Sequence, residues 1–347
     1  MKKHNVKKHK KRNRIKWRRM IITLFVIAVV YSFLPIIPFW LIDGAPASDN
    51  NKANVKKLAN NEGVYFSFIV FGDNHAGLVF NDAATVKEVW HMNREDRFRK
   101  VPIDFVLSVG DVALDGTRKQ YEASKKVQKL IKYPFITAIG NHDERDLFEE
   151  FYGEKEFTFS NRNSYFIVFD NEDGQPSEEQ FAWLEDKLKE GQEYGHIFIA
   201  MHKPPFDPYQ QEWYNEDNSP WAYRFRKLCA EYNVDIVFTG HKHMFKAEEF
   251  DGVTNIVTGG GGMLLEIPES EGGYHHYVRV MVNNDYVTYE VRKVSPPLWE
   301  FVTYYMWKEM IYWFRNLYGT GYIFKRNTIM QPLRETKLND KEYWLWE

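Results

Sequence analysis

The sequence is poor in cysteine: Cys229 is the only one in 347 residues, so no internal disulfide can form and a disulfide scaffold is excluded. Acidic residues are missing from the first 19 positions, which carry eleven Lys and Arg, and residues 20–42 carry no charge at all. The other 305 residues hold 35 basic and 48 acidic side chains, a net of -13 that the overall charge of -2 conceals. A body this acidic argues against nucleic acid as a partner. The 44% content of hydrophobic residues excludes a disordered chain.

Residues 20–42 predict a membrane anchor. These 23 uncharged residues are long enough to span the hydrocarbon core as a helix. The basic tail, residues 1–19, is expected to stay in the cytoplasm, which makes the protein single-pass with its body outside the cytoplasm. A cleaved signal peptide is the alternative, because residues 45–47 read Ala-Pro-Ala. We favour the retained anchor, since the apolar run is longer than a usual signal core.

The rest of the chain divides by composition. The polar residues 43–62 predict a linker, residues 63–294 a folded domain, and residues 295–347 an aromatic-rich helical extension. The extension is expected to pack on the domain or, alternatively, to rest on the membrane. The loop 204–220 carries aromatic residues and predicts either a lid over a substrate or an ordinary surface loop.

Apolar runs and helical patterns alternate through the domain. Strands are expected at 64–71, 103–109, 135–139, 165–169, 196–201 and 235–238. Helices are expected at 82–100, 117–132, 143–152, 177–190 and 223–232. From residue 246 to 293 the pattern becomes strand, glycine turn, strand, which predicts antiparallel hairpins. The expected fold class is therefore α/β, a layered sandwich with mixed strand directions.

Polar residues with metal-ligating side chains follow five of the expected strands. They are Asp73 and His75, Asp111, Asn141 with His142, His202, and His241 with His243. Ligands of open α/β sheets bind beyond the carboxyl ends of the strands, so we expect these side chains to converge. The other histidines of the domain, His91, His196, His275 and His276, are expected to be structural.

Oxygen and imidazole donors together suit Mn, Fe, Zn, Co or Ni rather than Ca or Mg, and the lack of thiolates argues against structural zinc. Seven donor side chains are too many for one tetrahedral ion. Two divalent metal ions that share one carboxylate fit the set, and such a pair promotes in-line displacement at phosphorus.

The order Asp-x-His, Gly-Asp, Gly-Asn-His-Asp, His, Gly-His-x-His resembles the calcineurin-like metallophosphoesterase superfamily. The resemblance implies a four-layer α/β/β/α sandwich. It also implies that Asp73, His75 and His243 bind one metal, that Asn141, His202 and His241 bind the other, and that Asp111 bridges them. His142 would then be no ligand but the catalytic acid that protonates the leaving oxygen.

Fewer residues indicate which branch of the superfamily the sequence resembles. Leu114 stands where purple acid phosphatases carry a metal-binding Tyr, which argues against an iron site of that kind. The layout from Gln180 to Pro205 resembles bacterial cyclic-nucleotide-phosphodiesterase-like members. Asp115 and Asp143 are candidates to orient His142, although we favour turn and helix-start roles for both.

The predicted function is hydrolysis of a small or lipid-linked phosphomonoester or phosphodiester by a hydroxide that bridges the two metals, with a histidine as general acid. Two alternatives remain open. One is a noncatalytic metal-binding scaffold at the cell surface, and the other is a nuclease, which the acidic body disfavours.

Overall fold

The computed structural model describes residues 16–27, 30, 36–95, 101–208, 219–265 and 267–295. Part of the predicted anchor, most of the loop 204–220 and nearly all of the predicted extension 295–347 lie outside these residues. Residues 16–27 are helical, and α2 spans Ile36–Leu41. Among the described helices none is long and apolar enough to cross a membrane. The anchor therefore remains a prediction.

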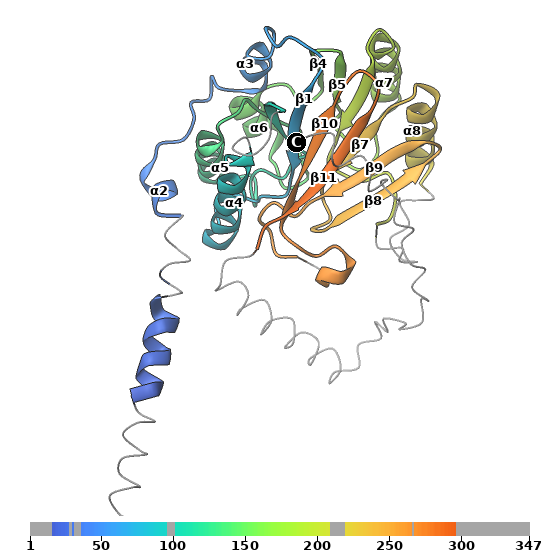
Figure 1. The fold of residues 1–347 in the computed structure, drawn as a ribbon. Helices are drawn as coiled ribbons and strands as arrows, with labels where there is room; N and C mark the ends of the chain where they lie inside the picture. Colours follow the sequence, from blue (N-terminus) through green and yellow to red (C-terminus); the bar gives the residue numbers. More distant parts are fainter. Residues whose placement is uncertain are drawn as a thin grey trace, which may run out of the picture. The chain divides into compact units, whose positions relative to one another are not determined.

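The first of two sheets has the strand order β11–β10–β1–β2–β3, of which β11, β10 and β1 are labelled in Figure 1. In that order its strands span Val287–Lys293, His276–Val282, Phe66–Phe71, Ile103–Ser108 and Phe135–Thr137. Neighbours β1, β2 and β3 run parallel, whereas β10 is antiparallel to both β1 and β11. The carboxyl ends of three parallel strands therefore meet at one edge of this sheet.

The second sheet has the order β4–β5–β6–β7–β9–β8. In that order its strands span Phe157–Asn161, Ser164–Val168, His196–Ala200, Ile236–Thr239, Val253–Thr258 and Phe245–Phe250. Strands β5, β6, β7 and β9 are parallel, and the two outer strands β4 and β8 are antiparallel to their neighbours. Mixed strand direction is thus confirmed in both sheets.

The two sheets pack face to face around a core rich in phenylalanine. Phe68 of β1 stacks on Phe105 of β2 at 5.0 Å between ring centroids and meets Phe166 of β5 edge-on at 5.2 Å. These rings are fully buried, and phenylalanine pairs of this geometry stabilise a core beyond their buried area. The faces that the two sheets turn toward each other are therefore apolar.

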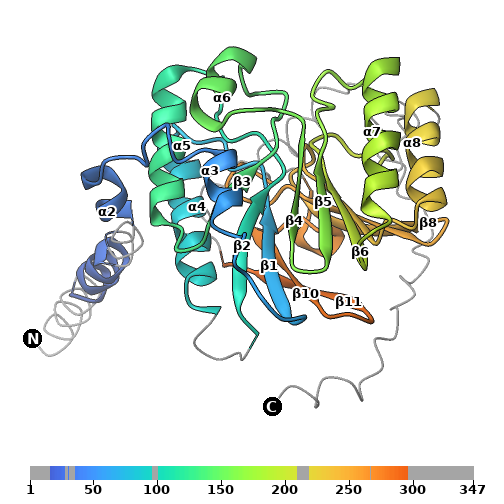
Figure 2. The same cartoon turned by 90° about the horizontal axis from the view of Figure 1, so that it is seen from above.

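Helices cover the outer face of each sheet, as the view from above shows (Figure 2). On the first sheet lie α4, α5 and α6, which span Val79–Met92, Arg118–Leu130 and Arg145–Tyr152. On the second lie α7 and α8, which span Glu178–Gly191 and Pro220–Glu231. The layers run helix, sheet, sheet, helix, which is the α/β/β/α order that the resemblance implies.

The predicted helices differ from the observed ones chiefly at their ends. The helix predicted at 82–100 begins three residues earlier and ends at Met92. Asn93 stops it, because its side chain donates to the Leu130 carbonyl and accepts from the Lys132 amide at the end of α5. This end depends on a tertiary contact. The capping boxes at Thr117 and Ser177 start α5 and α7 close to where the sequence predicts.

The strands between 246 and 293 form two hairpins, as predicted, but the hairpins belong to different sheets. β8 and β9 complete the second sheet, whereas β10 and β11 complete the first. The segment between β9 and β10, which includes a short 3-10 helix at Glu269–Glu271, crosses from one sheet to the other. It therefore passes the strand ends that carry the candidate site.

The segment predicted as a linker, residues 43–62, is folded onto the domain, so this prediction is wrong. It contains α3, Asn51–Lys56. The Asn51 side chain donates to the Thr137 carbonyl and accepts from the Thr137 amide, both at 2.9 Å. Thr137 belongs to the edge strand β3, whose free backbone groups need partners. Asn51 supplies both partners and so continues the ladder of hydrogen bonds at this sheet edge.

The domain also begins earlier than its predicted start at residue 63. Phe39 in α2 is only 3% exposed and belongs to the core beneath α4 and α5. Its neighbours Trp40 and Leu41 are 50% and 80% exposed. One side of α2 is therefore packed on the domain while the other side presents apolar residues to the surroundings.

Candidate metal centre

The eight residues singled out by the sequence lie in loops that follow five strands. Asp73 and His75 follow β1, Asp111 follows β2, Asn141 and His142 follow β3, His202 follows β6, and His241 and His243 follow β7. These strands are parallel neighbours within their own sheets. The two sheets face each other, so the loops of both meet at one edge of the sandwich.

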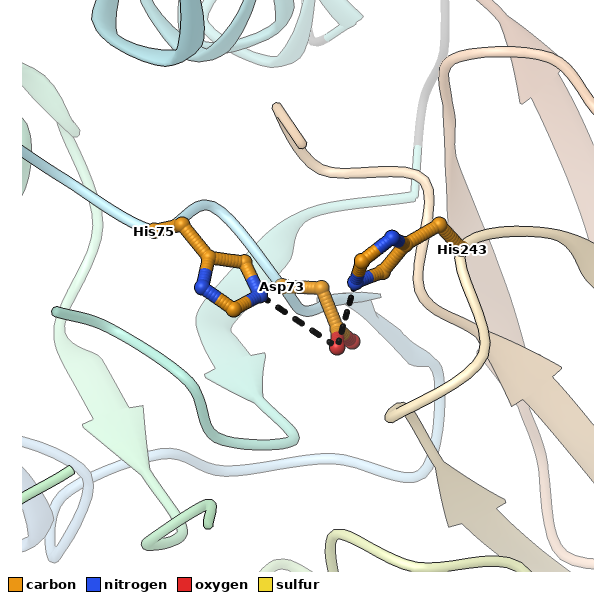
Figure 3. Close-up of side chains that lie close together, drawn as sticks. All are labelled: Asp73, His75 and His243. Carbon is orange, nitrogen blue, oxygen red and sulfur yellow. Dashed lines mark ion pairs between the residues drawn. The ribbon is translucent and has the colours of Figure 1, made fainter. Parts of the chain in front are cut away.

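A first group consists of Asp73, His75 and His243, whose side chains point toward one another (Figure 3). The Asp73 Oδ1 atom lies 3.9 Å from His75 Nε2 and 3.7 Å from His243 Nε2. Asp73 and His75 are completely buried. The three side chains come from the loop after β1 of the first sheet and the loop after β7 of the second. They meet because the two sheets pack against each other.

Asp111 lies between this first group and a second one. Its Oδ2 atom is 3.4 Å from His75 Nε2 on one side and 3.2 Å from His202 Nε2 on the other. The second group is completed by Asn141, whose Oδ1 atom lies 3.0 Å from His202 Nε2 and 2.7 Å from His241 Nδ1. Asp111 thus lies in contact with a histidine of each group.

The two groups fit cations because their polar atoms are mostly acceptors. Neither ring nitrogen of His75 has a hydrogen-bond partner, although the side chain is buried. His202 Nδ1 is 2.9 Å from the Val109 carbonyl, to which it donates, so in the neutral ring Nε2 presents a lone pair to the oxygens of Asp111 and Asn141. Converging lone pairs repel unless a positive charge lies between them.

The pKa shifts agree with a site built for positive charge. Burial lowers the pKa of His75 to about 3 and strongly lowers that of His241, so both rings are neutral and able to ligate. Burial also acts to lower the pKa of His202, but the nearby Asp111 carboxylate outweighs it and raises the pKa to about 9. The Asp111 carboxylate thus favours a positive charge at His202 Nε2, and a bound cation would supply that charge in place of the proton.

The backbone is held in an unusual conformation at four of the seven predicted ligands. Asp73, His75, Asp111 and His241 have φ angles of 60°, 42°, 54° and 68°. Residues other than glycine rarely adopt this left-handed region, and strain of this kind concentrates at functional sites. The surrounding fold therefore holds these side chains in place against the local preference of the chain.

Two glycines leave room for the carboxylates. A Cβ atom on Gly140 would lie 2.2 Å from Asp111 Oδ1, and one on Gly240 would lie 2.3 Å from Asp73 Oδ2. Both distances are far inside van der Waals contact. Each carboxylate therefore packs against a backbone position that has no room for a side chain. This explains why glycine occupies the first position of the Gly-Asn-His and Gly-His patterns.

His142 lies beside the two groups. Its ring centroid is 4.7 Å from that of His75, and its backbone amide donates to Asp111 Oδ1 at 2.8 Å. Its Nδ1 atom is 2.7 Å from the Leu114 carbonyl, the acceptor that fixes the ring. His75, Asp111 and His142 also form a set of donors whose ligand atoms lie within 4.8 Å of one another. The imidazole is nevertheless exposed, as a group that meets a substrate must be.

Neither acidic candidate orients His142. Asp115 bonds to the Gln120 side chain in the capping box of α5. Asp143 accepts backbone N–H groups from Val112, Ala113 and Gly140, and its burial raises its pKa to about 7. Asp115 thus has the helix-start role favoured for it, whereas Glu144 and not Asp143 caps α6. Asp143 ties the loop after β2 to the loop after β3, which keeps Asp111 beside Asn141.

Sequence reasoning missed the groups that orient the histidines. The acceptors are the backbone carbonyls of Leu114 for His142, of Val109 for His202 and of Leu264 for His243. It also missed Asn171, whose Oδ1 atom accepts the amides of His202 and Lys203 at 3.0 Å each. Every residue has a backbone carbonyl, so no sequence pattern could show which three carbonyls orient the histidines. His196 and His276, in contrast, bond to groups away from the candidate site: His196 to Asp235 and the Asn283 carbonyl, and His276 to Thr258 and the Tyr274 carbonyl.

The fold and the donor set together define an α/β sandwich protein with a two-part cation site at the carboxyl ends of its strands. Comparison with known proteins gives the family. The family model for calcineurin-like phosphoesterases matches residues 66–245, so the chain belongs to this family. The matched stretch begins at β1 and ends at the start of β8, and it contains all eight predicted site residues.

Two curated relatives match shorter stretches. A probable glycerophosphodiester phosphodiesterase GpdQ of Arcobacter nitrofigilis is 26% identical over 116 residues, which are 29% of this chain and 42% of the relative. A probable cyclic nucleotide phosphodiesterase of Rhodopseudomonas palustris is 28% identical over 120 residues, 30% of this chain and 44% of the relative. The match thus spans less than half the length of either relative.

Solved structures support the fold. The purple acid phosphatase PPD1 of yellow lupin superposes with a TM-score of 0.54 at 18% identity, over 67% of this chain and 52% of that one. GAP50, described as the anchor in the inner membrane complex of Plasmodium, has a TM-score of 0.51 at 14% identity, over 67% of this chain and 85% of its own. A phosphatase and an anchor share the sandwich, so function must be argued from the site.

Proposed function

We propose that this chain is a metal-dependent phosphoric ester hydrolase acting on small or lipid-linked phosphoesters, with phosphodiesters favoured. The single observation that carries the proposal is the position of Asp111. One of its carboxylate oxygens lies within 3.4 Å of a histidine from each group, and His142, an exposed imidazole, stands next to it. Such a site has both cation ligands and a group that can deliver a proton.

The proposed ligands divide as the two groups do. Asp73, His75 and His243 would hold one divalent cation, and Asn141, His202 and His241 the other, with Asp111 shared. When bound, two such cations activate water and neutralise charge on a phosphate group. The neutral rings of His75 and His241 and the ionised Asp111 are the protonation states that ligation requires.

His142 serves in this proposal as the acid. Its Nδ1–H is donated to the Leu114 carbonyl, so Nε2 is the atom that gains and loses the proton. The imidazolium can give this proton to the oxygen that leaves the phosphorus atom, and an alkoxide is a poor leaving group without it. The fixed ring lies within reach because its own backbone amide is bonded to Asp111.

The names of the two curated relatives favour a small phosphodiester as the substrate. The net charge of -13 on residues 43–347 supports the same choice, since a polyanion such as nucleic acid would be repelled by the surface. A compact phosphoester needs to meet only the cations and the groups beside them.

A panel of phosphoesters tests the function on the full-length chain. It contains aryl phosphate mono- and diesters, glycerophosphodiesters, cyclic nucleotides and short oligonucleotides, each assayed with Mn, Fe, Zn or Co. We expect metal-dependent turnover of the small diesters at rates well above those with oligonucleotides. Turnover of none of these compounds, with metal bound at two ions per chain, would support the noncatalytic scaffold instead. Faster cleavage of oligonucleotides would support the nuclease.

We further propose that the part of residues 20–42 that precedes α2 anchors the protein as a single-pass membrane protein with its domain outside the cytoplasm. The eleven basic residues before this segment and its lack of charge support both the anchor and the orientation. We expect the 41.4 kDa chain to stay in membranes washed with alkaline carbonate. External protease should digest the domain in right-side-out vesicles. A shortened chain released by the carbonate wash would instead indicate a cleaved signal peptide.

A further inference from the structure

One lysine beside the candidate metal centre has no acidic partner. Lys203 directly follows His202 and is partly exposed, and its ammonium makes no ion pair and no hydrogen bond with any residue that the structure describes. Lys155 and Lys227, in contrast, pair with carboxylates at 2.6 Å and 2.8 Å. In a body with a net charge of -13, an ammonium without a counterion beside a functional site is available to an anion from outside the chain.

The backbone of Lys203 is fixed by Asn171. The Asn171 Oδ1 atom accepts the Lys203 amide at 3.0 Å, and Asn171 Nδ2 donates to the Lys203 carbonyl at 2.7 Å. Pro204 and Pro205 follow, and their rings restrict the backbone further. The same Asn171 oxygen accepts the His202 amide, so one side chain positions both the proposed ligand and the lysine.

The Lys203 side chain lies against Gly174, in the loop that follows β5. A Cβ atom on Gly174 would lie 3.2 Å from Lys203 Nζ and 3.5 Å from its Cδ. Gly174 has a φ of 81°, a conformation that favours glycine, so the loop leaves room for the lysine there. The side chain is held by packing rather than by a charged partner. A side chain of similar length without the charge can therefore keep this contact.

Lys203 lies on the side of the second ligand group, whereas His142 lies on the side of the first. Burial lowers the pKa of His241 and nearby positive charges, that of Lys203 among them, lower it further, so the ammonium is near this ring. The His142 ring centroid is 4.7 Å from that of His75 in the first group. A leaving oxygen that takes its proton from His142 therefore lies toward the first group. The part of the substrate that stays on the phosphorus atom can extend toward Lys203.

We propose that Lys203 is a specificity-determining residue whose ammonium binds an acidic group, a carboxylate or a second phosphate, on the part of the substrate that stays on the phosphorus atom. This inference rests on the proposed function and narrows its substrate class to phosphoesters that carry a second acidic group. The acidic body would repel such a group, and Lys203 supplies a positive charge at the place where the group arrives. Hydrogen bonds between an ammonium and an acidic oxygen are stronger than those between neutral groups, which makes the pairing selective.

A matched pair of diesters tests the inference on the full-length chain. Carboxymethyl nitrophenyl phosphate and ethyl nitrophenyl phosphate share their leaving group and differ by one carboxylate on the retained part. Lys203→Met removes the charge but keeps the packing on Gly174, Lys203→Arg keeps the charge, and the control Lys129→Met removes an exposed lysine of α5. We expect the ratio of kcat/KM for the acidic diester over the neutral one to fall about tenfold or more in Lys203→Met only. An unchanged ratio, or an equal loss on both diesters, would overturn the inference, whereas wild-type turnover of the neutral diester would leave the proposed function standing.

A binding measurement does not depend on turnover. Phosphonoacetate and ethylphosphonate have no ester bond to hydrolyse and differ by the same carboxylate, and calorimetry gives the Kd of each for the metal-loaded full-length chain. We expect the wild type and Lys203→Arg to prefer phosphonoacetate by about tenfold more than Lys203→Met does. The preference of the wild type should weaken as the salt concentration rises from about 0.05 M to about 0.5 M, because Lys203 is partly exposed. A preference of equal size in Lys203→Met would overturn the inference whether or not the protein hydrolyses any phosphoester.

Discussion

Replacement of Asp111 by asparagine should remove both metal binding and turnover. The substitution Asp111→Asn keeps the size of the side chain but deletes the negative charge between His75 and His202, whose Nε2 atoms lie 3.4 Å and 3.2 Å from the carboxylate. One neutral amide cannot replace a carboxylate shared by two cations, because the attraction of opposite charges in a buried site is large. We expect fewer than one metal ion per chain by elemental analysis. The kcat/KM for an aryl phosphate diester should fall by at least about a thousandfold.

Asp251→Asn is the matched control for this experiment. Asp251 has nearly the same left-handed backbone as Asp111, with φ of 51° against 54°, but lies on the surface paired with Lys227. It should retain wild-type metal content and turnover, which separates the loss of charge at the centre from the loss of an aspartate in a strained turn. An Asp111→Asn protein that keeps two metals and its rate would contradict the bridging position. Full turnover without metal would contradict the metal-dependent reaction.

The gathering of the candidate ligands at one edge could be predicted from the sequence because of the sheet rather than because of any one residue. Asp73, Asp111 and Asn141 follow parallel neighbouring strands, so a reader who recognises the strands knows that the loops meet. His202 and His243 come from the other sheet, and their approach depends on how the sandwich closes. Strand ends therefore indicated which residues share the site. The order of the strands decided which of them touch.

What the sequence did not reveal depends on partners far along the chain. Asn51 lies in a polar segment whose composition is that of a linker, yet its amide pairs with Thr137, 86 residues away. Phe39 lies in an apolar run that suggests lipid on all sides, yet it is buried in the core of the first sheet. The composition of a segment indicates how that segment behaves on its own. A single residue in it can still pair with a distant sheet edge or fill a gap between helices, and composition does not indicate which residue does so.

Replacement of His142 by glutamine should slow the reaction in proportion to how much the leaving oxygen needs a proton. Glutamine occupies similar space and can bond to the Leu114 carbonyl, but it has no proton to transfer. For an alkyl ester we expect kcat to fall by about a hundredfold to ten-thousandfold, the range of general acid catalysis. For a nitrophenyl ester, whose anion leaves unaided, we expect a loss of less than about tenfold. Rates for a series of esters with increasingly basic leaving groups measure this difference as a slope.

The metal content of His142→Gln and the kinetics of Asp115→Asn distinguish a metal-ligating His142 from one that donates a proton. His75, Asp111 and His142 could together hold an ion, in which case His142→Gln would lose metal and slow every ester alike. As a proton donor, His142 is dispensable for metal binding, so His142→Gln should keep two metals per chain. Asp115→Asn should leave the slope unchanged, because Asp115 bonds to Gln120 and the backbone carbonyl of Leu114 holds the imidazole. A slope in His142→Gln equal to that of the wild type would remove the histidine from the reaction, since proton delivery is the one role whose effect grows with the basicity of the leaving group.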